Sequence, residues 1–138
     1  MEMPRKLLAA GALALLAAGP AVAQEIDEAL AAEGERVWRQ CQACHQIGEG
    51  AQNRVGPHLN GVIGRQAGSL EGFRYSNAMV EAGEEGLVWD EPTLEDYLEN
   101  PRAKVPGTSM AFAGLRQEQQ RDAVVEYIKA SGGLDNDG

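Results

Sequence analysis

The chain has 138 residues, 17 of them glycine, and a formal net charge of −9 at pH 7. This length allows one domain. An acidic chain of pI ≈ 4.6 has no global attraction for nucleic acid or for anionic membrane surfaces, because both repel it, and nucleic-acid binding is excluded on that ground. Only seven residues are aromatic. A small domain so poor in core-forming side chains often relies on a stabilising cross-link or on a large apolar cofactor.

The N-terminal residues have the pattern of a secretory signal. A basic start at Arg5 and Lys6 precedes the uncharged run Leu7–Gly19, and Ala21-Val22-Ala23 has the small-x-small pattern of a cleavage site. The run is shorter than the roughly 20 apolar residues of a spanning helix, and an uncleaved membrane anchor is the alternative. We expect residues 1–23 to be removed and the protein to lie in the periplasm.

The processed chain would have 115 residues and a net charge of −10, because residues 1–23 contain two basic residues and one acidic residue. We expect residues 24–133 to form the domain. Residues 134–138 follow the last predicted helix and are expected to be a disordered tail.

Helix patterns are strongest at the two ends of the domain. Asp27 to about Gln42 carries apolar residues at helical spacing between charges. Gly34 inside this pattern costs about 1 kcal/mol relative to alanine, which suggests that another backbone approaches closely there. Gln117–Ser131 has the same spacing and is followed by Gly132-Gly133, a typical helix end.

Two shorter helices are predicted between the terminal ones. One covers Ser76–Ala82. The other covers Thr93–Asn100, with Thr93 as its N-cap and Pro101 as the residue that stops it.

Two long segments have neither a helical nor a strand pattern. Residues 48–72 contain seven glycines and no sustained alternation, and residues 101–114 form a second irregular stretch. A compact domain rarely tolerates two such loops unless something internal gives them a surface to pack on. We therefore expect a large ligand inside the domain.

Both cysteines occur in one motif, Cys41-Gln42-Ala43-Cys44-His45. At positions i and i+3 the two thiols face one side of a helical turn, where they can form thioethers to the two vinyl groups of a haem, and His45 follows at once to bind the iron. Secretion agrees with this, because haem c is attached outside the cytoplasm. The motif predicts one haem c, bound covalently through Cys41 and Cys44.

Three other uses of the cysteines compete with haem attachment. A thioredoxin-like redox pair needs a preceding strand and a βαβ pattern, and neither is visible. A zinc site would use Cys41, Cys44, His45 and His58, but the adjacent residues 44 and 45 cannot readily supply two corners of a tetrahedron. A structural disulfide explains neither His45 nor the shortage of core residues.

A haem iron that only transfers electrons needs a second axial ligand. The candidates are Met79, Met110 and His58. Met110 lies in the turn Pro106–Met110 rather than on a helical apolar stripe, which favours a ligand delivered by a loop over a core-filling methionine. His58 is interpreted instead as a loop residue near the surface.

Six further segments follow the haem motif in a characteristic order. They are Val55-Gly56-Pro57-His58-Leu59-Asn60-Gly61, Gly64-Arg65, Gly72-Phe73-Arg74-Tyr75, Leu87-Val88-Trp89, Tyr97-Leu98-Glu99-Asn100-Pro101 and Val105-Pro106-Gly107-Thr108-Ser109-Met110-Ala111-Phe112-Ala113-Gly114. With this set the chain resembles the soluble class I cytochromes c, specifically the group of mitochondrial cytochromes c and bacterial cytochromes c2, over nearly all of Glu33–Gly132. The resemblance implies an all-α fold, in which three to five short helices and long loops wrap around one covalent haem.

The resemblance also implies roles for residues near the iron. His45 would be the proximal ligand and Met110 the distal ligand. The carbonyl of Pro57 would accept the other imidazole N–H, which fixes the ring and raises the basicity of the ligand. Tyr97 and Thr108 would lie behind the distal ligand, with Tyr97 near its sulfur.

Other implied contacts involve the haem propionates and the terminal helices. Tyr75 and Trp89 would donate to a propionate, and Arg65 would offset its charge. Without the resemblance, Trp89 and Tyr97 would be interpreted as core residues and Arg65 as a solvated one. The residues that would form the crossing of the terminal helices are Gly34, Trp38, Val124, Tyr127 and Ile128.

The sequence departs from the family pattern in two respects. Met79 stands where the family usually has an asparagine, and about three extra residues follow in Ala82–Gly86. Gln40 and Ser109 occupy positions where lysine is common around the exposed haem edge. Part of the basic ring used for docking would be retained by Arg54, Arg102, Lys104 and Arg116. The acidic residues collect elsewhere, at Glu81, Glu84, Glu85, Asp90, Glu91, Glu95 and Asp96.

Together these features predict a soluble, monomeric one-electron carrier that is not an enzyme. The expected donor is a cytochrome bc-type complex, and the expected acceptor is a photosynthetic reaction centre, a terminal oxidase or a peroxidase. The alternative is a haem enzyme or gas sensor in which Met110 leaves the iron open. A third interpretation is a structural metal module built on the two cysteines.

Overall fold

The computed structural model describes residues 11, 14–17, 19 and 25–134. Most of the predicted signal and residues 135–138 of the predicted tail lie outside these residues. Leu134, the first residue of that tail, is half-buried against the core. No helix in the described ranges is both long and apolar enough to cross a membrane.

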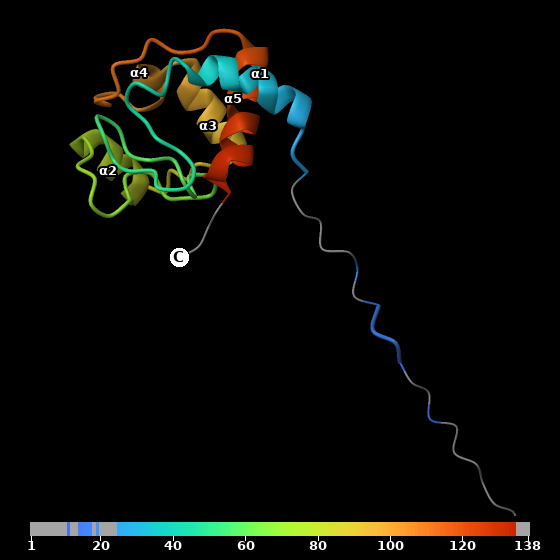
Figure 1. The fold of residues 1–138 in the computed structure, drawn as a ribbon. Coiled ribbons are helices and arrows are strands. Elements are labelled where there is room, and N and C mark those ends of the chain that lie inside the picture. Colours follow the sequence, from blue (N-terminus) through green and yellow to red (C-terminus); the bar gives the residue numbers. More distant parts are fainter. Residues whose placement is uncertain (1–10, 12–13, 18, 20–24, 135–138) are drawn as a thin grey trace, which may run out of the picture.

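The described chain folds into short helices joined by long loops (Figure 1). In chain order they are α1 (Glu28–Trp38), α2 (Asn77–Glu84), α3 (Glu91–Glu99), α4 (Pro101–Lys104) and α5 (Glu118–Ile128), followed by the π-helical turn η1 (Lys129–Gly133). Within the described residues the only β-type pairing is an isolated bridge between Gln66 and Val88. The predicted all-α fold class is confirmed.

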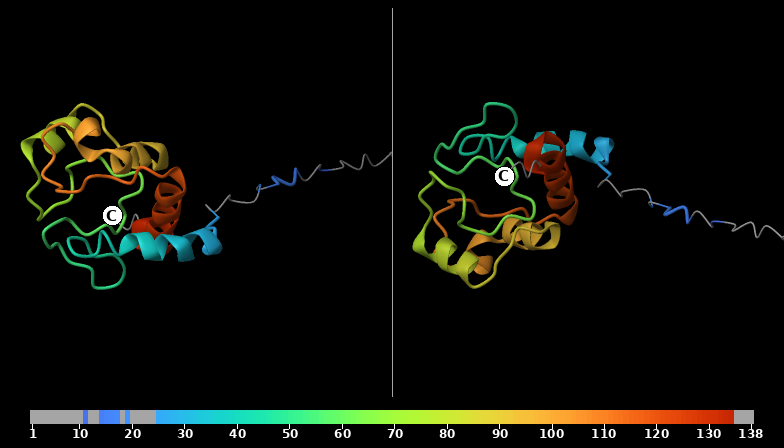
Figure 2. Two further views of the ribbon diagram at one scale, coloured as in Figure 1. Left: turned by 90° about the horizontal axis from the view of Figure 1, so that it is seen from above. Right: turned by 90° about the horizontal axis from the view of Figure 1, so that it is seen from below.

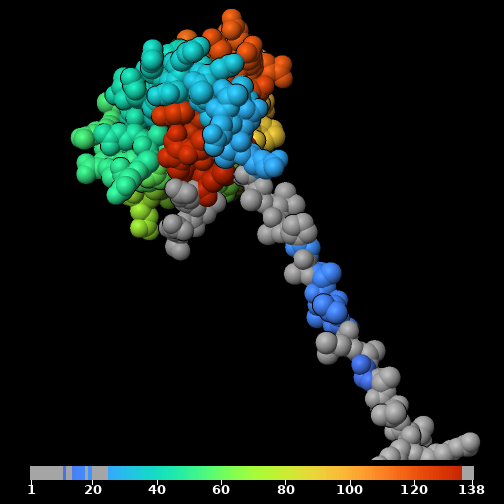
Figure 3. All heavy atoms as spheres, turned by 45° about the vertical axis from the view of Figure 1, so that its right-hand side comes forward, coloured from blue at the N-terminus to red at the C-terminus, as the bar shows by residue number. Residues whose placement is uncertain are grey.

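The first and last helices cross in close contact, as the views of Figures 1 and 3 both show. At the crossing, a Cβ on Gly34 would clash with the carbonyl of Ala123 and would lie 2.7 Å from the Cβ of Tyr127. The rings of Trp38 and Tyr127 pack at a centroid distance of 5.6 Å. The predicted reason for a glycine inside this helix is therefore confirmed.

The middle helices differ from the sequence prediction at their ends. Helix α2 has Ser76 as its N-cap and continues to Glu84, so part of the extra segment after residue 81 lengthens this helix. Thr93 was predicted as the N-cap of α3, and this was wrong. The cap is Asp90, whose Oδ1 accepts the N–H of Thr93 at 2.9 Å, and the helix begins at Glu91.

Helix α4 forms inside the segment 101–114 that was predicted to be irregular. Pro101 does stop α3, but it also occupies the first turn of α4, where its missing N–H costs nothing. Asn100 caps this turn by accepting the N–H of Ala103. Seen from above and below, α2 and α1 lie on opposite sides of the domain, with the long loops between them (Figure 2).

Candidate functional site

A cavity of about 260 Å³ lies among the helices and loops, and its lining comes from almost every part of the domain. All ten residues predicted to bind the haem or its iron line this cavity. They are Cys41, Cys44, His45, Pro57, Arg65, Tyr75, Trp89, Tyr97, Thr108 and Met110. The fold thus gathers into one place residues that are spread over 70 positions of sequence.

The cysteine motif follows α1 directly. The helix ends at Trp38, four residues before the predicted end, but the chain continues in tight turns in which the N–H groups of Cys41 and His45 donate to the carbonyls of Trp38 and Cys41. Both cysteines are half-buried free thiols on the cavity wall. Burial, assisted by the neighbouring Cys44, raises the pKa of Cys41 to about 11.

A thiol with a raised pKa is a poor nucleophile, because the thiolate is the reactive form. This disfavours a thioredoxin-like redox pair. Within the described residues, no three side chains of the histidine, cysteine, aspartate and glutamate types gather closely enough to hold a metal ion. The zinc interpretation therefore finds no support in the described geometry.

His45 is held in one orientation. Its Nδ1 lies 2.7 Å from the carbonyl oxygen of Pro57, so Nδ1 carries the proton and Nε2 keeps a free lone pair. Burial lowers the pKa of His45, against the opposing effect of the Pro57 hydrogen bond, and the imidazole is neutral at pH 7. A neutral, oriented imidazole with a free Nε2 is the form that binds a metal.

Gly56 explains how the imidazole fits. A Cβ on this residue would lie 2.8 Å from Nδ1 and 2.9 Å from Nε2 of His45, closer than real Cβ contacts allow. The backbone of Gly56 therefore lies flat against the imidazole ring. Its N–H also donates to the carbonyl of Cys44 at 2.9 Å, which ties the 54–58 loop to the cysteine motif.

Met110 reaches the cavity on a hydrogen-bonded loop. The hydroxyls of Tyr97 and Thr108 lie 2.7 Å apart, and Thr108 Oγ1 accepts the N–H of Met110 at 3.5 Å. The ring of Trp89 packs on that of Tyr97 at 4.9 Å. Burial raises the pKa of Tyr97, an effect that its bond to Thr108 partly offsets, so the phenol of Tyr97 stays neutral.

Arg65 brings a positive charge to the cavity. Its Nη1 donates to the carbonyl of Asn60 at 3.0 Å, and no carboxylate of the described residues pairs with it. Burial lowers its pKa, and nearby Tyr75 opposes that shift. A half-buried guanidinium without a carboxylate is suited to an anionic ligand.

The comparisons with known proteins agree with this geometry. The family model described as Cytochrome c matches residues 31–131. The chain belongs to the cytochrome c family.

Several relatives of this cytochrome c are named cytochrome c2. One from Afifella marina is 58% identical over 109 residues, which cover 79% of this chain and 86% of the relative, and one from Blastochloris viridis is 47% identical over 80% of each chain. The solved structure of cytochrome c2 from Rhodospirillum centenum has a TM-score of 0.70 and 40% identity, with coverage of 74% of this chain and 98% of that one. These are the proteins to which this chain is similar.

The residues present fit a haem c. Two free thiols lie at positions i and i+3, and the Nε2 of His45 is free beside them. The cavity is mostly apolar, and Arg65 on its wall has no ion pair with a carboxylate of the described residues. As a member of its family, this cytochrome c is an electron carrier with one covalently bound haem c.

The mouth of the cavity is uncharged. The residues that line the cavity and are also exposed are Gln40, Val55, Ser109 and Ala111. Exposed Arg54 directly precedes Val55, and Arg102 and Lys104 lie on α4. Lys104 forms an ion pair of 3.3 Å with Asp96, so this member of the predicted basic ring is partly neutralised.

Some cavity residues were missed by the sequence analysis. Phe73, Leu98 and Phe112 line the cavity and were not singled out as ligand contacts. Gly56 was quoted only as part of a segment, although a glycine directly before the proline that binds His45 is a usable signal. Met79, which was considered as an axial ligand and noted as a departure from the family, is buried on the cavity wall.

Proposed function

We propose that this cytochrome c is a one-electron carrier of the periplasm whose haem iron is bound by His45 and Met110. The observation that carries the proposal is the bond between His45 Nδ1 and the carbonyl of Pro57, because it leaves Nε2 free inside a cavity that Met110 also lines. The names of the relatives, cytochrome c2, support the carrier role. The secretory pattern of residues 1–23 supports the compartment.

Each group of cavity residues has a task in this proposal. A bound haem would supply a redox centre that gains one electron from a donor and loses it to an acceptor without a bond being made or broken. Cys41 and Cys44 fix the haem as thioethers, and Pro57 keeps His45 in one orientation. The Tyr97–Thr108 pair holds the loop that carries Met110.

The propionate end is served by other residues. Arg65 neutralises one carboxylate, and Tyr75 and Trp89 donate hydrogen bonds to it. Because the lining of the cavity is mostly apolar, the charge on a bound haem would interact more strongly with these groups than it would in water.

The proposed donor is a cytochrome bc-type complex, and the proposed acceptors are a photosynthetic reaction centre, a terminal oxidase or a peroxidase. The protein would dock at the cavity mouth, where Val55 and Ala111 are exposed and Arg54 is adjacent. The arginine would pair with carboxylates of the partner, while the uncharged mouth permits close approach to the haem edge.

Absorption spectra of the oxidised and reduced protein, produced in a host with haem-ligation machinery, test the iron ligands. We expect sharp low-spin bands in the reduced protein and the weak near-infrared band of an iron–methionine bond in the oxidised protein. Met110→Ala should lose the near-infrared band, whereas Met79→Leu should keep it. A high-spin spectrum, or carbon monoxide binding by the native reduced protein, would contradict the carrier role and favour a haem enzyme or gas sensor.

A further inference from the structure

The peptide group between Pro57 and His58 makes a hydrogen bond at each of its two ends. Its carbonyl oxygen accepts from His45 Nδ1 at 2.7 Å, and its N–H donates to Asn53 Oδ1 at 3.0 Å. No cis peptide bond occurs among the described residues, and in a planar trans peptide the C=O and N–H bonds point in opposite directions. His45 and Asn53 therefore lie on opposite sides of the same peptide group.

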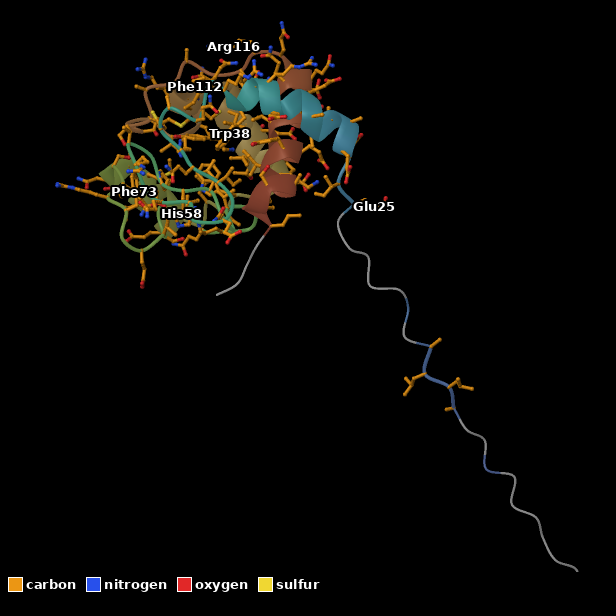
Figure 4. All side chains as sticks on the ribbon, viewed as in Figure 1. Glu25, Trp38, His58, Phe73, Phe112 and Arg116 are labelled. Carbon is orange, nitrogen blue, oxygen red and sulfur yellow. The ribbon has the colours of Figure 1, made fainter. Side chains whose placement is uncertain are left out.

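The side-chain amide of Asn53 is held between two segments of the chain. Because its partner at the peptide is an N–H donor, the amide oxygen faces the 54–58 loop. The amide nitrogen faces another loop, since Nδ2 lies 3.9 Å from the position that a Cβ on Gly72 would take. Phe73, the next residue there, lines the cavity, and Figure 4 shows His58 and Phe73 at the same end of the domain. Asn53 thus lies close to the cavity but is not one of the residues that line it.

We propose that Asn53 is a positioning residue for the iron ligand. It polarises the peptide group between Pro57 and His58, strengthens the hydrogen bond of His45 Nδ1, and so makes His45 Nε2 a stronger electron donor to a bound metal. The inference rests on the proposed function, in which His45 binds the haem iron. It adds to that function a side chain that acts on His45 through a single peptide group.

The physical basis is the mutual polarisation of hydrogen bonds that form a chain. When an amide N–H donates to an oxygen, the carbonyl of the same amide becomes a better acceptor, and each bond strengthens the next by about 10–30%. A stronger acceptor at Nδ1 raises the basicity of the imidazole as a ligand. A more basic ligand stabilises the more positive oxidation state of a metal, so the chain of bonds is expected to lower the reduction potential.

A purely structural role for Asn53 is the competing explanation, because its bond also closes a short turn. Other bonds already hold this loop, however. The N–H of Gly56 donates to the carbonyl of Cys44 at 2.9 Å, and the N–H of Leu59 donates to the carbonyl of Gln46 at 3.0 Å. The two explanations differ in one outcome. A better acceptor at residue 53 strengthens the imidazole bond if polarisation matters, whereas a structural brace is only kept or lost.

Two substitutions at residue 53 change the acceptor in opposite directions. Asn53→Leu removes it at similar size, and Asn53→Asp supplies a charged oxygen, which forms shorter and stronger hydrogen bonds. In the haem-loaded, reduced protein we expect the NMR resonance of the His45 Nδ1 proton to move to lower frequency in Asn53→Leu and to higher frequency in Asn53→Asp, because protons in stronger hydrogen bonds resonate at higher frequency. The reduction potential should rise in Asn53→Leu and fall in Asn53→Asp.

Gln52→Glu is the matched control for the added charge. Gln52 is the exposed neighbour of Asn53, and its bond to Gln46 Oε1 is made by its backbone N–H, which the substitution leaves in place. Gln52→Glu adds the same charge one residue away. It should leave the proton resonance of His45 unchanged and lower the potential less than Asn53→Asp does.

Three results would overturn the inference: a wild-type resonance of His45 in Asn53→Asp, a shift of that resonance in the same direction in both variants of residue 53, or an equal fall in potential in Gln52→Glu and Asn53→Asp. If Asn53→Leu does not fold, the comparison of Asn53→Asp with Gln52→Glu still decides. Failure of the proposed function would be seen separately, as a high-spin wild-type spectrum.

Discussion

At the scale of single residues, the tightest constraint on the site is the contact between Gly56 and His45. A methyl group at residue 56 would lie within 3 Å of both ring nitrogens, so we expect Gly56→Ala to displace the imidazole and weaken its bond to Pro57. The expected cost is about 1–3 kcal/mol of unfolding free energy, as for other overpacked sites. Denaturant unfolding measures it, and the reduced spectrum reports whether the iron remains low-spin.

A matched glycine separates packing from backbone effects. Gly64 has φ of +84°, and a Cβ there would meet nothing within 4 Å. Gly64→Ala therefore reports the cost of the left-handed backbone alone, roughly 1–2 kcal/mol, and should leave the spectrum unchanged. Equal spectra for the two variants would show that Gly56 does not position His45.

Removal of the Tyr97 hydroxyl tests whether its hydrogen bond stabilises the loop that carries Met110. Tyr97→Phe removes the 2.7 Å bond to Thr108, and we expect a loss of about 1 kcal/mol of stability. Because Thr108 also accepts the N–H of Met110, the near-infrared band should disappear at a lower temperature than in the wild type. Tyr127→Phe, in a tyrosine that does not line the cavity, should not change that temperature, and a similar shift in both variants would refute a local role.

At the scale of elements, a buried ion cluster joins the ends of three helices. Lys129 lies 3.0 Å from Glu91 and 3.1 Å from Glu126, and the other carboxylate oxygen of Glu126 accepts the N–H of Asp27 at 2.7 Å. The side chain of Lys129 is only 7% exposed. Residues at the starts of α1 and α3 are thereby fixed to the end of α5.

Removal of the lysine should leave two carboxylates facing each other. We expect Lys129→Met to lower the unfolding free energy by about 3 kcal/mol, as for other broken buried pairs. Lys104→Met, which breaks the more exposed pair with Asp96, should cost about 0–1 kcal/mol. Comparable losses in the two variants would contradict a stabilising role for the buried cluster.

The pH dependence of this effect has a defined sign. Burial lowers the pKa of Lys129, but its hydrogen bonds and charge interactions with Glu91 and Glu126 outweigh burial, so the pKa is raised above the ordinary 10.5. The stabilisation is then complete below pH 10.5 and declines as the pH rises through the raised value. The difference between wild type and Lys129→Met should shrink over that range in thermal unfolding measurements.

The sequence allowed prediction of those elements that depend on local pattern or on adjacent residues. The haem motif with Cys41, Cys44 and His45, the glycine at the helix crossing and the terminal helices were of this kind. The other seven of the ten cavity residues lie in the ordered segments that carry the family resemblance. The N-cap of α3 was wrong because Asp90 and Thr93 are both good caps, and Pro92 between them fits the first turn of a helix. Helix α4 was missed because Pro101 both ends one helix and begins the next.

Contacts between residues that are far apart in the sequence could not be predicted in the same way. Glu126 and Lys129 are three positions apart on an otherwise apolar helix end, but their partners Asp27 and Glu91 are far away in sequence. The hydrogen bond that Asn53 accepts likewise depends on how its loop packs. Such features follow from the assembled fold, and no periodicity or motif in the chain specifies them.

At the scale of the whole molecule, the charge is unevenly distributed: the chain is negative overall, whereas the exposed residues at the cavity mouth carry no charge. Arg54 is exposed beside this mouth, so we expect it to steer the acidic face of a donor complex towards the haem edge. Arg54→Glu should lower the second-order rate of reduction by a cytochrome bc-type complex roughly tenfold or more at low ionic strength. Stopped-flow measurements over a range of salt concentrations test this.

A second variant distinguishes steering at the mouth from an effect of net charge. Arg36→Glu makes the same change of charge at an exposed residue of α1 that does not line the cavity. If only net charge matters, both variants slow reduction equally. If docking occurs at the mouth, Arg54→Glu has the larger effect, and the difference disappears as salt screens charges over distances of about 10 Å at 0.1 M. Reduction rates that do not depend on ionic strength in the wild type would refute electrostatic docking and leave the uncharged mouth as the main contact.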